Sequence, residues 1–368
     1  MTDIPHIDIN AHMTEILDHA VLCGASDIFF SNGTPVVMKI QGRQEEVTMD
    51  ELDDVHIRRL IRDISDDEQL DFIAENRQAD WATSTNKGRF RVNVGYQQNT
   101  LFAVIRTIPS EVIPADKLGT PYELIKASTR TKGLVLVTGP TGSGKSTTLA
   151  GLIDYINETR ACHILTLEDP IEFSHTRKQA IINQRNLGTD FTSWEAGLKA
   201  AMRQAPDVIL IGEMRDRETV DAALKAAETG HLVMGTLHTN GAAETINRIV
   251  EFYPHDAHSQ IQSQLATNIV AVMSQQLIPS AKQGKRVMAY ELMLRNNAIV
   301  SNIRTLNIPQ MIMAISTGSK FGMVQMDKML ADFVNNGDIT EEQALERCTD
   351  PKGFLELLGR KVEETTRI

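Results

Sequence analysis

The residues with the clearest chemical meaning form a glycine-rich segment, residues 139–146, which reads Gly-Pro-Thr-Gly-Ser-Gly-Lys-Ser. It matches the phosphate-binding pattern G-x-x-x-x-G-K-[ST], in which backbone N–H groups surround the β-phosphate at the start of a helix. We expect Lys145 to reach the β- and γ-phosphates and Ser146 to ligate Mg²⁺. The sequence therefore predicts a nucleoside triphosphate site made of Thr141, Gly142, Ser143, Gly144, Lys145, Ser146 and Thr147.

Two further apolar segments each deliver an acidic residue. Residues 208–211 lead through a glycine to Glu213, which we assign to the Mg²⁺ shell through a water molecule. Residues 163–167 lead to Glu168, our candidate for the group that orients or deprotonates the attacking water. Glu172 is held in reserve for that role, and either glutamate could instead cap the segment that follows it.

Two histidines, His231 and His238, bracket another apolar segment. His238 would emerge at the carboxyl end of this expected strand, where it could sense the γ-phosphate. A shared metal is the weaker interpretation, because the two histidines are seven positions apart and have no obvious third ligand. His231 could equally be a buried structural residue.

Arg89, Arg91 and Arg106 form a separate group of candidates near the N-terminus. The alternation in residues 88–94 predicts a strand with Arg89 and Arg91 on one face and apolar side chains on the other. Such arginines could simply line a solvated face. They could also act as arginine fingers toward a nucleotide held by a neighbouring subunit.

The elements that precede the glycine-rich segment predict a small α+β domain over residues 1–108. Apolar residues recur at helical spacing in residues 12–24, and an acidic helical stretch covers roughly residues 50–75. Short strands are expected at residues 27–30, 36–40, 88–94 and 101–105, the last two as a hairpin. Pro109, Pro114 and Pro121 then predict a linker over residues 109–121.

Residues 122–368 predict a second, α/β domain. Continuous apolar runs at 133–137, 163–167, 208–211 and 232–236 are typical of parallel strands that are buried on both faces. Helices are expected between them, starting with the one that follows the phosphate-binding segment. From about residue 257 the chain is expected to be helical, with Ile261, Leu265, Ile269 and Val272 on one face.

Composition excludes several classes of protein. The chain has 368 residues, of which 42% are hydrophobic and 23% charged, as in an ordinary globular protein. No apolar run is long enough for a transmembrane helix and the first residues do not resemble a secretory signal, so a cytoplasmic protein without membrane insertion is expected. Most of the net charge of −11 lies in the first 100 residues, which disfavours nucleic acid as a partner. The three cysteines are widely spaced and predict neither disulfides nor a zinc site.

The order of these segments resembles the type II/IV secretion ATPase superfamily. The resemblance rests on the phosphate-binding segment, on Leu-Glu-Asp-Pro-Ile-Glu-Phe at 167–173, on Ile-Gly-Glu-Met-Arg-Asp at 211–216 and on the two-histidine segment at 229–240. Residues 25–27, 88–93 and 106–110 extend it over nearly the whole chain. Within the superfamily, the pattern is most similar to the PilT-like retraction ATPases of type IV pili.

The resemblance implies a homohexamer whose subunits have a PAS-like N-terminal domain and a RecA-like ATPase domain with a helical C-terminal extension. It implies that Mg²⁺ and ATP bind between the domains, that Arg91 and Arg106 help complete the site, and that Glu168 is the catalytic base and Glu213 the Walker B acid. The expected partner is an inner-membrane platform protein, which the chain would meet on the cytoplasmic side of the membrane, at the base of the pilus machine. A paralogous motor ATPase could be a second partner.

Some features bear on which machine the chain serves. It lacks the tetracysteine module and long N-terminal region of assembly ATPases, which favours retraction. Residues 298–305, Ala-Ile-Val-Ser-Asn-Ile-Arg-Thr, depart from the usual retraction motif, Ala-Ile-Arg-Asn-Leu-Ile-Arg-Glu, in its first arginine and final glutamate. The alternatives are a PilU-like accessory motor, a DotB-like type IVB secretion ATPase and a nucleotide-gated scaffold. A RecA-like DNA translocase also fits the phosphate-binding segment, but the acidic N-terminal part of the chain disfavours it.

Overall fold

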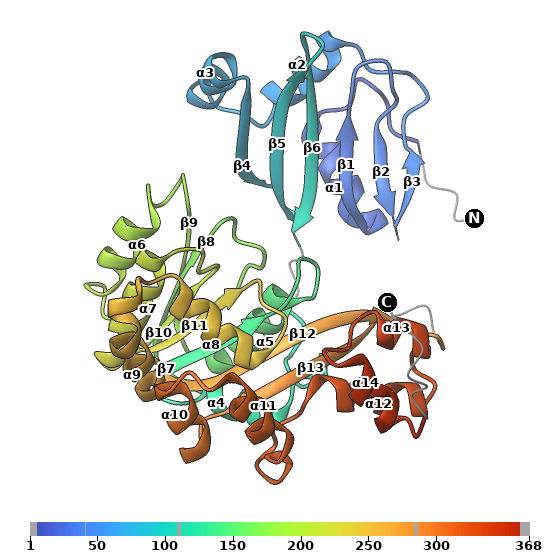
Figure 1. Cartoon of the computed structure of the whole chain (residues 1–368). Coiled ribbons are helices and arrows are strands. Elements are labelled where there is room, and N and C mark those ends of the chain that lie inside the picture. The colour runs from blue at the N-terminus through green and yellow to red at the C-terminus, as the bar shows by residue number, and fades with distance from the viewer. Residues whose placement is uncertain (1–5, 41, 109–111, 283–285, 361–368) are drawn as a thin grey trace. The chain divides into compact units, whose positions relative to one another are not determined.

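The computed structural model describes residues 6–40, 42–108, 112–282 and 286–360. The chain divides into two compact units, Met1–Glu111 with Glu172–Ser174, and Val112–Ile171 with His175–Ile368 (Figure 1). Of the linker expected at residues 109–121, residues 109–111 lie outside the described part of the chain. Residues 112–121 belong to the second unit. Ala115 of that segment is buried in the core of this unit.

The first unit is built on a six-stranded antiparallel sheet with the strand order β3-β2-β1-β6-β5-β4 (Figure 1). The expected hairpin of β5 and β6 is confirmed, and on β5 Phe90, Val92 and Val94 are buried as the alternation predicts. The acidic stretch forms two helices instead of one continuous helix. The elements are α1 (Met13–Cys23), β1 (Ala25–Phe30), β2 (Val37–Ile40), β3 (Arg43–Glu46), α2 (Asp54–Arg62), α3 (Asp67–Asn76), β4 (Gln78–Ser84), β5 (Arg89–Gln97) and β6 (Thr100–Ile108).

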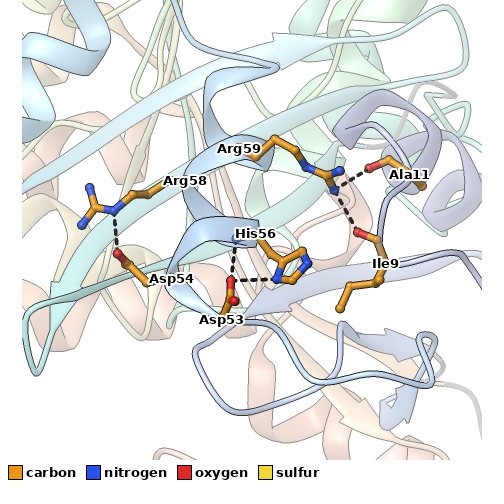
Figure 2. Close-up of polar contacts among 7 residues, drawn as sticks. All are labelled: Ile9, Ala11, Asp53, Asp54, His56, Arg58 and Arg59. Atoms are coloured by element: carbon orange, nitrogen blue, oxygen red, sulfur yellow. Dashed lines mark hydrogen bonds and ion pairs between the residues drawn. The ribbon is translucent and has the colours of Figure 1, made fainter.

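Helix α2 is fixed at both its start and its exposed side, as Figure 2 shows. Asp53 caps the helix by accepting a hydrogen bond of 2.8 Å from the backbone N–H of His56. Arg59 extends from the helix to the N-terminal segment, where its Nη2 donates to the carbonyl oxygens of Ile9 (2.8 Å) and Ala11 (3.2 Å). The cap therefore fixes the start of the helix, and Arg59 ties residues 9–11 to it.

We expect Asp53→Ala to lower the urea midpoint of unfolding of the first unit, because it removes the N-cap side chain that accepts from the His56 N–H. Urea unfolding followed by fluorescence measures this. A Trp194→Phe background leaves the buried Trp81 as the reporter of this unit. Glu51→Ala, which removes an exposed carboxylate outside the cap, is the control. An equal loss in both variants would contradict the assignment of the cap.

The second unit contains a seven-stranded sheet with the order β13-β12-β7-β11-β10-β8-β9. All neighbouring pairs are parallel except β12 and β13, which are antiparallel. The strands are β7 (Gly133–Thr138), β8 (His163–Glu168), β9 (Ile181–Asn186), β10 (Val208–Ile211), β11 (Leu232–Leu237), β12 (Ile269–Pro279) and β13 (Arg286–Leu294).

Helices cover both faces of this sheet, which is why β7, β10 and β11 are buried along their whole length. Helices α4 (Tyr122–Ser128) and α5 (Lys145–Thr159) share one core with the sheet. The opposite core contains residues of α6 (Trp194–Ala201), α7 (Arg217–Glu228), α8 (Ala242–Glu251), α9 (His258–Asn268), α10 (Asn297–Arg304) and α11 (Ile308–Ser316). A separate small core joins β12 and β13 to α12 (Met326–Asn335), α13 (Glu341–Leu345) and α14 (Pro351–Leu357). No described helix has the length and apolarity needed to cross a bilayer.

The expectation of a helical chain from about residue 257 was wrong for the segment between α9 and α10. Helix α9 ends at Asn268, and Ile269 and Val272 belong to strand β12, which lies between β7 and β13 in the sheet. A short apolar run fits a buried strand as well as a helix face, and local spacing does not separate the two. The α-helical prediction holds only for residues 258–268 and for the segment after residue 296.

Candidate functional site

The phosphate-binding segment forms a loop between the end of β7 and the start of α5. Gly139, Gly142 and Gly144 adopt φ values of 142°, 78° and 88°, which other residues rarely tolerate. A Cβ atom at Gly139 would also lie only 2.2 Å from the backbone oxygen of Gln275. Glycine is therefore required here both for the backbone angle and for the close approach of β12.

The polar groups of this loop fit a polyphosphate. Lys145, only 9% exposed, directs Nζ toward the loop and donates to the carbonyl oxygens of Gly139 (2.9 Å) and Pro140 (3.1 Å). Ser143 Oγ is buried and makes no hydrogen bond within the described part of the chain. Ser146 and Thr147 lie in the first turn of α5, where N–H groups attract anions. A cationic side chain, an unpaired hydroxyl and a helix N-terminus thus converge on this loop.

Parallel register brings the predicted acids to the same edge of the sheet. Ile211 of β10 pairs with Leu167 of β8, so Gly212 and Glu168 follow side by side. A Cβ atom at Gly212 would lie 3.2 Å from the Cα of Glu168, which shows how closely the two strand ends approach. On the other side, Leu237 of β11 pairs with Thr138, the last residue before the phosphate-binding loop.

Glu213 lies in a cationic cluster at this edge. Its two carboxylate oxygens contact Arg215 Nη2 at 2.6 Å and His238 Nε2 at 3.3 Å. Burial alone would raise the pKa of Glu213, but the hydrogen bond from Arg215 and the charges of Arg215, His238 and Lys145 outweigh it, and the pKa is lowered. Glu213 is therefore ionised at neutral pH. Arg215 belongs to the segment 211–216 that carries the family resemblance, but nothing in the sequence marks it as the partner of Glu213.

Glu168 is held by neighbours on its own strand and on β9. Its Oε1 accepts hydrogen bonds from Thr166 Oγ1 (2.6 Å) and Gln184 Nε2 (3.2 Å). Two donors on one oxygen fix the plane of the carboxylate at the strand end. Glu172, the reserve candidate, falls in the segment 172–174 that groups with the first unit. Glu168 ends β8 at the same sheet edge at which Gly212 and Glu213 follow β10.

The two histidines lie at opposite ends of β11. His231 precedes the strand, and its Nδ1 contacts the carbonyl oxygen of Ala226 at 2.9 Å. His238 follows the strand and contacts Glu213 instead. A strand of this length separates them by roughly 20 Å, so they do not share a metal ion. The described residues contain no group of three or more His, Cys, Asp or Glu side chains placed to hold a metal.

Strands β12 and β13 contribute polar residues that the sequence analysis missed. Ser274 Oγ accepts from the N–H of Gly241 at 2.8 Å, and Glu291 Oε1 accepts from the N–H of Ala242 at 2.7 Å. Burial raises the pKa of Glu291. Together they hold the start of α8 and the loop that follows His238. The polar run Ser-Gln-Gln at 274–276 inside an apolar segment is a signal for Ser274, whereas no local pattern marks Glu291.

The candidate arginines lie in the first unit, and two of them, Arg91 and Arg106, form ion pairs. Arg91 makes a bidentate ion pair with Asp80, with its Nε 3.0 Å from both carboxylate oxygens. Arg106, opposite Arg91 on the next strand, donates from Nε to Asp27 at 2.8 Å. Burial would raise the pKa of Asp27, but its bonds to Arg106 and Ser26 outweigh it and lower the pKa. The Arg106 side chain is nevertheless 67% exposed and accessible to a partner.

Comparisons with known proteins agree with these features. The family described as "Type II/IV secretion system protein" matches residues 6–319. Over 343 residues, the chain is 43% identical to the "Type IV pilus retractation ATPase PilT" of Pseudomonas aeruginosa, covering 93% of this chain and 99% of the relative. It is 38% identical to the "Type IV pilus ATPase PilU" of the same species over 323 residues, covering 88% and 85%.

A solved structure is similar over the same extent. The structure titled "Crystal Structure of the Pilus Retraction Motor PilT and Bound ADP" superposes with a TM-score of 0.86 and 41% sequence identity, covering 94% of this chain and 99% of that one. The fold, the phosphate-binding loop and the sequence similarity therefore agree along nearly the entire chain. The chain belongs to the type II/IV secretion system protein family, among its PilT-like ATPases.

Proposed function

We propose that this chain is an ATPase motor that couples ATP hydrolysis to retraction of a type IV pilus, and so to twitching motility. The observation that carries the proposal is the convergence of the phosphate-binding loop, Glu168, Glu213 and His238 on one sheet edge. The similarity to a pilus retraction ATPase over nearly the whole of both chains supports the mechanical role.

Each residue at this edge has a proposed task. The loop N–H groups and Lys145 bind the phosphates, while Ser146, and Glu213 through a water molecule, hold Mg²⁺. When bound, Mg²⁺ neutralises charge on the phosphate oxygens. Glu168 orients the attacking water and accepts its proton, and Thr166 and Gln184 support this by fixing the carboxylate. His238, beside Glu213, senses the γ-phosphate.

We further propose that the chain works as a homohexamer of a PAS-like first unit and a RecA-like second unit, the latter carrying the phosphate-binding loop. Arg91 and Arg106 of the first unit complete the site. The motor acts in the cytoplasm, at the inner-membrane base of the pilus machine, on a platform protein, without entering the membrane and without nucleic acid. A paralogous motor could share the task.

An accessory, PilU-like motor is the second candidate, because residues 298–305 depart from the retraction motif. The retained Ile299 and Ile303 are core residues of α10, whereas Val300 and Thr305, which replace the arginine and the glutamate, are less buried. Thr305 is exposed and open to a partner, whereas Val300 packs against the core. The greater identity to the retraction ATPase than to the PilU relative favours the first candidate.

Arg106→Ala should lower the turnover number of the oligomer at least about tenfold, because arginine fingers stabilise charge that develops on the phosphate in the transition state. The measurement is the ATPase rate of rings mixed from Arg106→Ala subunits and subunits with a disabled loop. The intact loops of the Arg106→Ala subunits recover activity if the loop-disabled neighbours supply the arginine. Arg58→Ala, which breaks another exposed ion pair of the first unit, is the control. A defect that persists in mixed rings would contradict action between subunits.

The experiment that tests the proposed function is the steady-state ATPase rate against protein concentration, with mass determination on the same samples. A rate per subunit that rises as the hexamer forms supports a shared site completed by a neighbour. Tight ATP binding with no turnover at any concentration would contradict the motor and favour a nucleotide-gated scaffold.

A further inference from the structure

Gln275, on strand β12, contacts the phosphate-binding loop at both ends. Its backbone oxygen lies against Gly139, where the loop begins, so closely that only glycine fits. Its side-chain Nε2 donates to the carbonyl oxygen of Ser143, near the end of the loop, at 2.7 Å. The residue is 1% exposed, so these contacts are shielded from water.

Both the oxygen and the nitrogen of the Gln275 side-chain amide make hydrogen bonds. While Nε2 donates to Ser143, Oε1 accepts from Thr148 Oγ1 on the first turns of α5 at 2.9 Å. One acceptor and one donor at these places fix the orientation of the amide, and only an amide of this length supplies both. Gln275 thereby links the loop to the helix that the loop introduces.

The bond to Ser143 determines the direction of the next N–H group. The carbonyl of Ser143 and the N–H of Gly144 belong to one planar trans peptide unit, so they point in opposite directions. With the carbonyl held toward β12, the Gly144 N–H points away from β12. A phosphate at a helix N-terminus is bound by N–H groups of this kind.

We propose that Gln275 is a positioning residue for nucleotide binding, which acts by fixing the Ser143–Gly144 peptide so that its N–H serves the phosphate. It acts through the loop and not by contact with the nucleotide. The inference rests on the proposed function in one respect, that the loop binds ADP and ATP. Because the two residues are 132 positions apart, the restraint comes from the sheet and not from the loop itself.

The test compares two variants of similar side-chain volume by titration with ADP. Gln275→Met fills the space but makes neither hydrogen bond, and we expect it to weaken ADP binding at least about tenfold. Gln275→Glu keeps an acceptor for Thr148 but sets a second acceptor against the Ser143 carbonyl, so it should bind ADP more weakly than Gln275→Met. A residue that only filled space would tolerate methionine without loss.

Two controls separate positioning from loss of the fold. Without nucleotide, the unfolding temperature of Gln275→Met should stay within about 3 °C of the wild type. Gln262→Met, at a half-buried position on α9, should bind ADP normally. Wild-type affinity in Gln275→Met overturns the proposal, and so does an equal affinity in the Met and Glu variants. A wild-type chain that binds ADP without hydrolysing ATP would contradict the proposed motor but not this assignment, which is read on binding.

Discussion

Lys145→Ala is expected to abolish productive nucleotide binding, with the affinity for ADP reduced at least about a hundredfold. Lys145 is the cation of the phosphate-binding loop, it is almost fully buried, and its Nζ already points at the loop carbonyls of Gly139 and Pro140. A charge in a buried site acts through a low effective dielectric, so its removal costs far more than the removal of a surface charge.

The measurement is the dissociation constant for ADP, together with the ATPase rate of the same sample. Lys126→Ala removes an exposed lysine from α4 of the same unit and should leave both values unchanged. If Lys145→Ala bound ADP within about tenfold of the wild type, the assignment of Lys145 as the cation that holds the β- and γ-phosphates would be wrong.

Glu168→Gln is expected to keep ATP bound while it slows hydrolysis at least about a hundredfold. Both donors, Thr166 and Gln184, contact the same carboxylate oxygen, Oε1. The amide oxygen of glutamine can take over these two bonds in the same place. The NH₂ group then replaces Oε2, so that a donor stands where a carboxylate oxygen would accept the proton of water.

Hydrolysis at saturating ATP measures this effect, and ADP titration confirms that binding is retained. Glu172→Gln is the matched control, because it makes the same change in the reserve candidate. We expect it to hydrolyse ATP normally. The reverse result, an inactive Glu172→Gln with a normal Glu168→Gln, would show that the base had been assigned to the wrong glutamate.

The sequence was informative wherever local pattern and tertiary position agree. The continuous apolar run of residues 133–137 predicted β7, and the glycines that follow it predicted the loop, because this motif joins a strand to a helix through a tight turn. Parallel register then brought Glu168 and Glu213 to the same edge, as a buried strand before each of them implied.

The parts that could not be predicted depend on contacts between distant segments. Strand β12 reads locally like the continuation of α9, and only its pairing with β7 and β13 makes it a strand. Arg215 and Gln275 acquire their roles through neighbours in space, Glu213 and Ser143. The motif at 211–216 contains Arg215 without revealing this contact, and Gln275 lies in none of the motifs. Residues inside a motif can be recognised from the sequence, whereas residues that contact the motif from another strand, such as Gln275, cannot.

The most direct test of the central claim is to follow labelled type IV pili on living cells from which the gene for this chain has been deleted. We predict that pili still extend but do not shorten, that the wild-type gene restores shortening, and that the Glu168→Gln gene does not. Shortening at the normal frequency in the deletion strain, or loss of pilus extension, would contradict the account of this chain as the retraction motor.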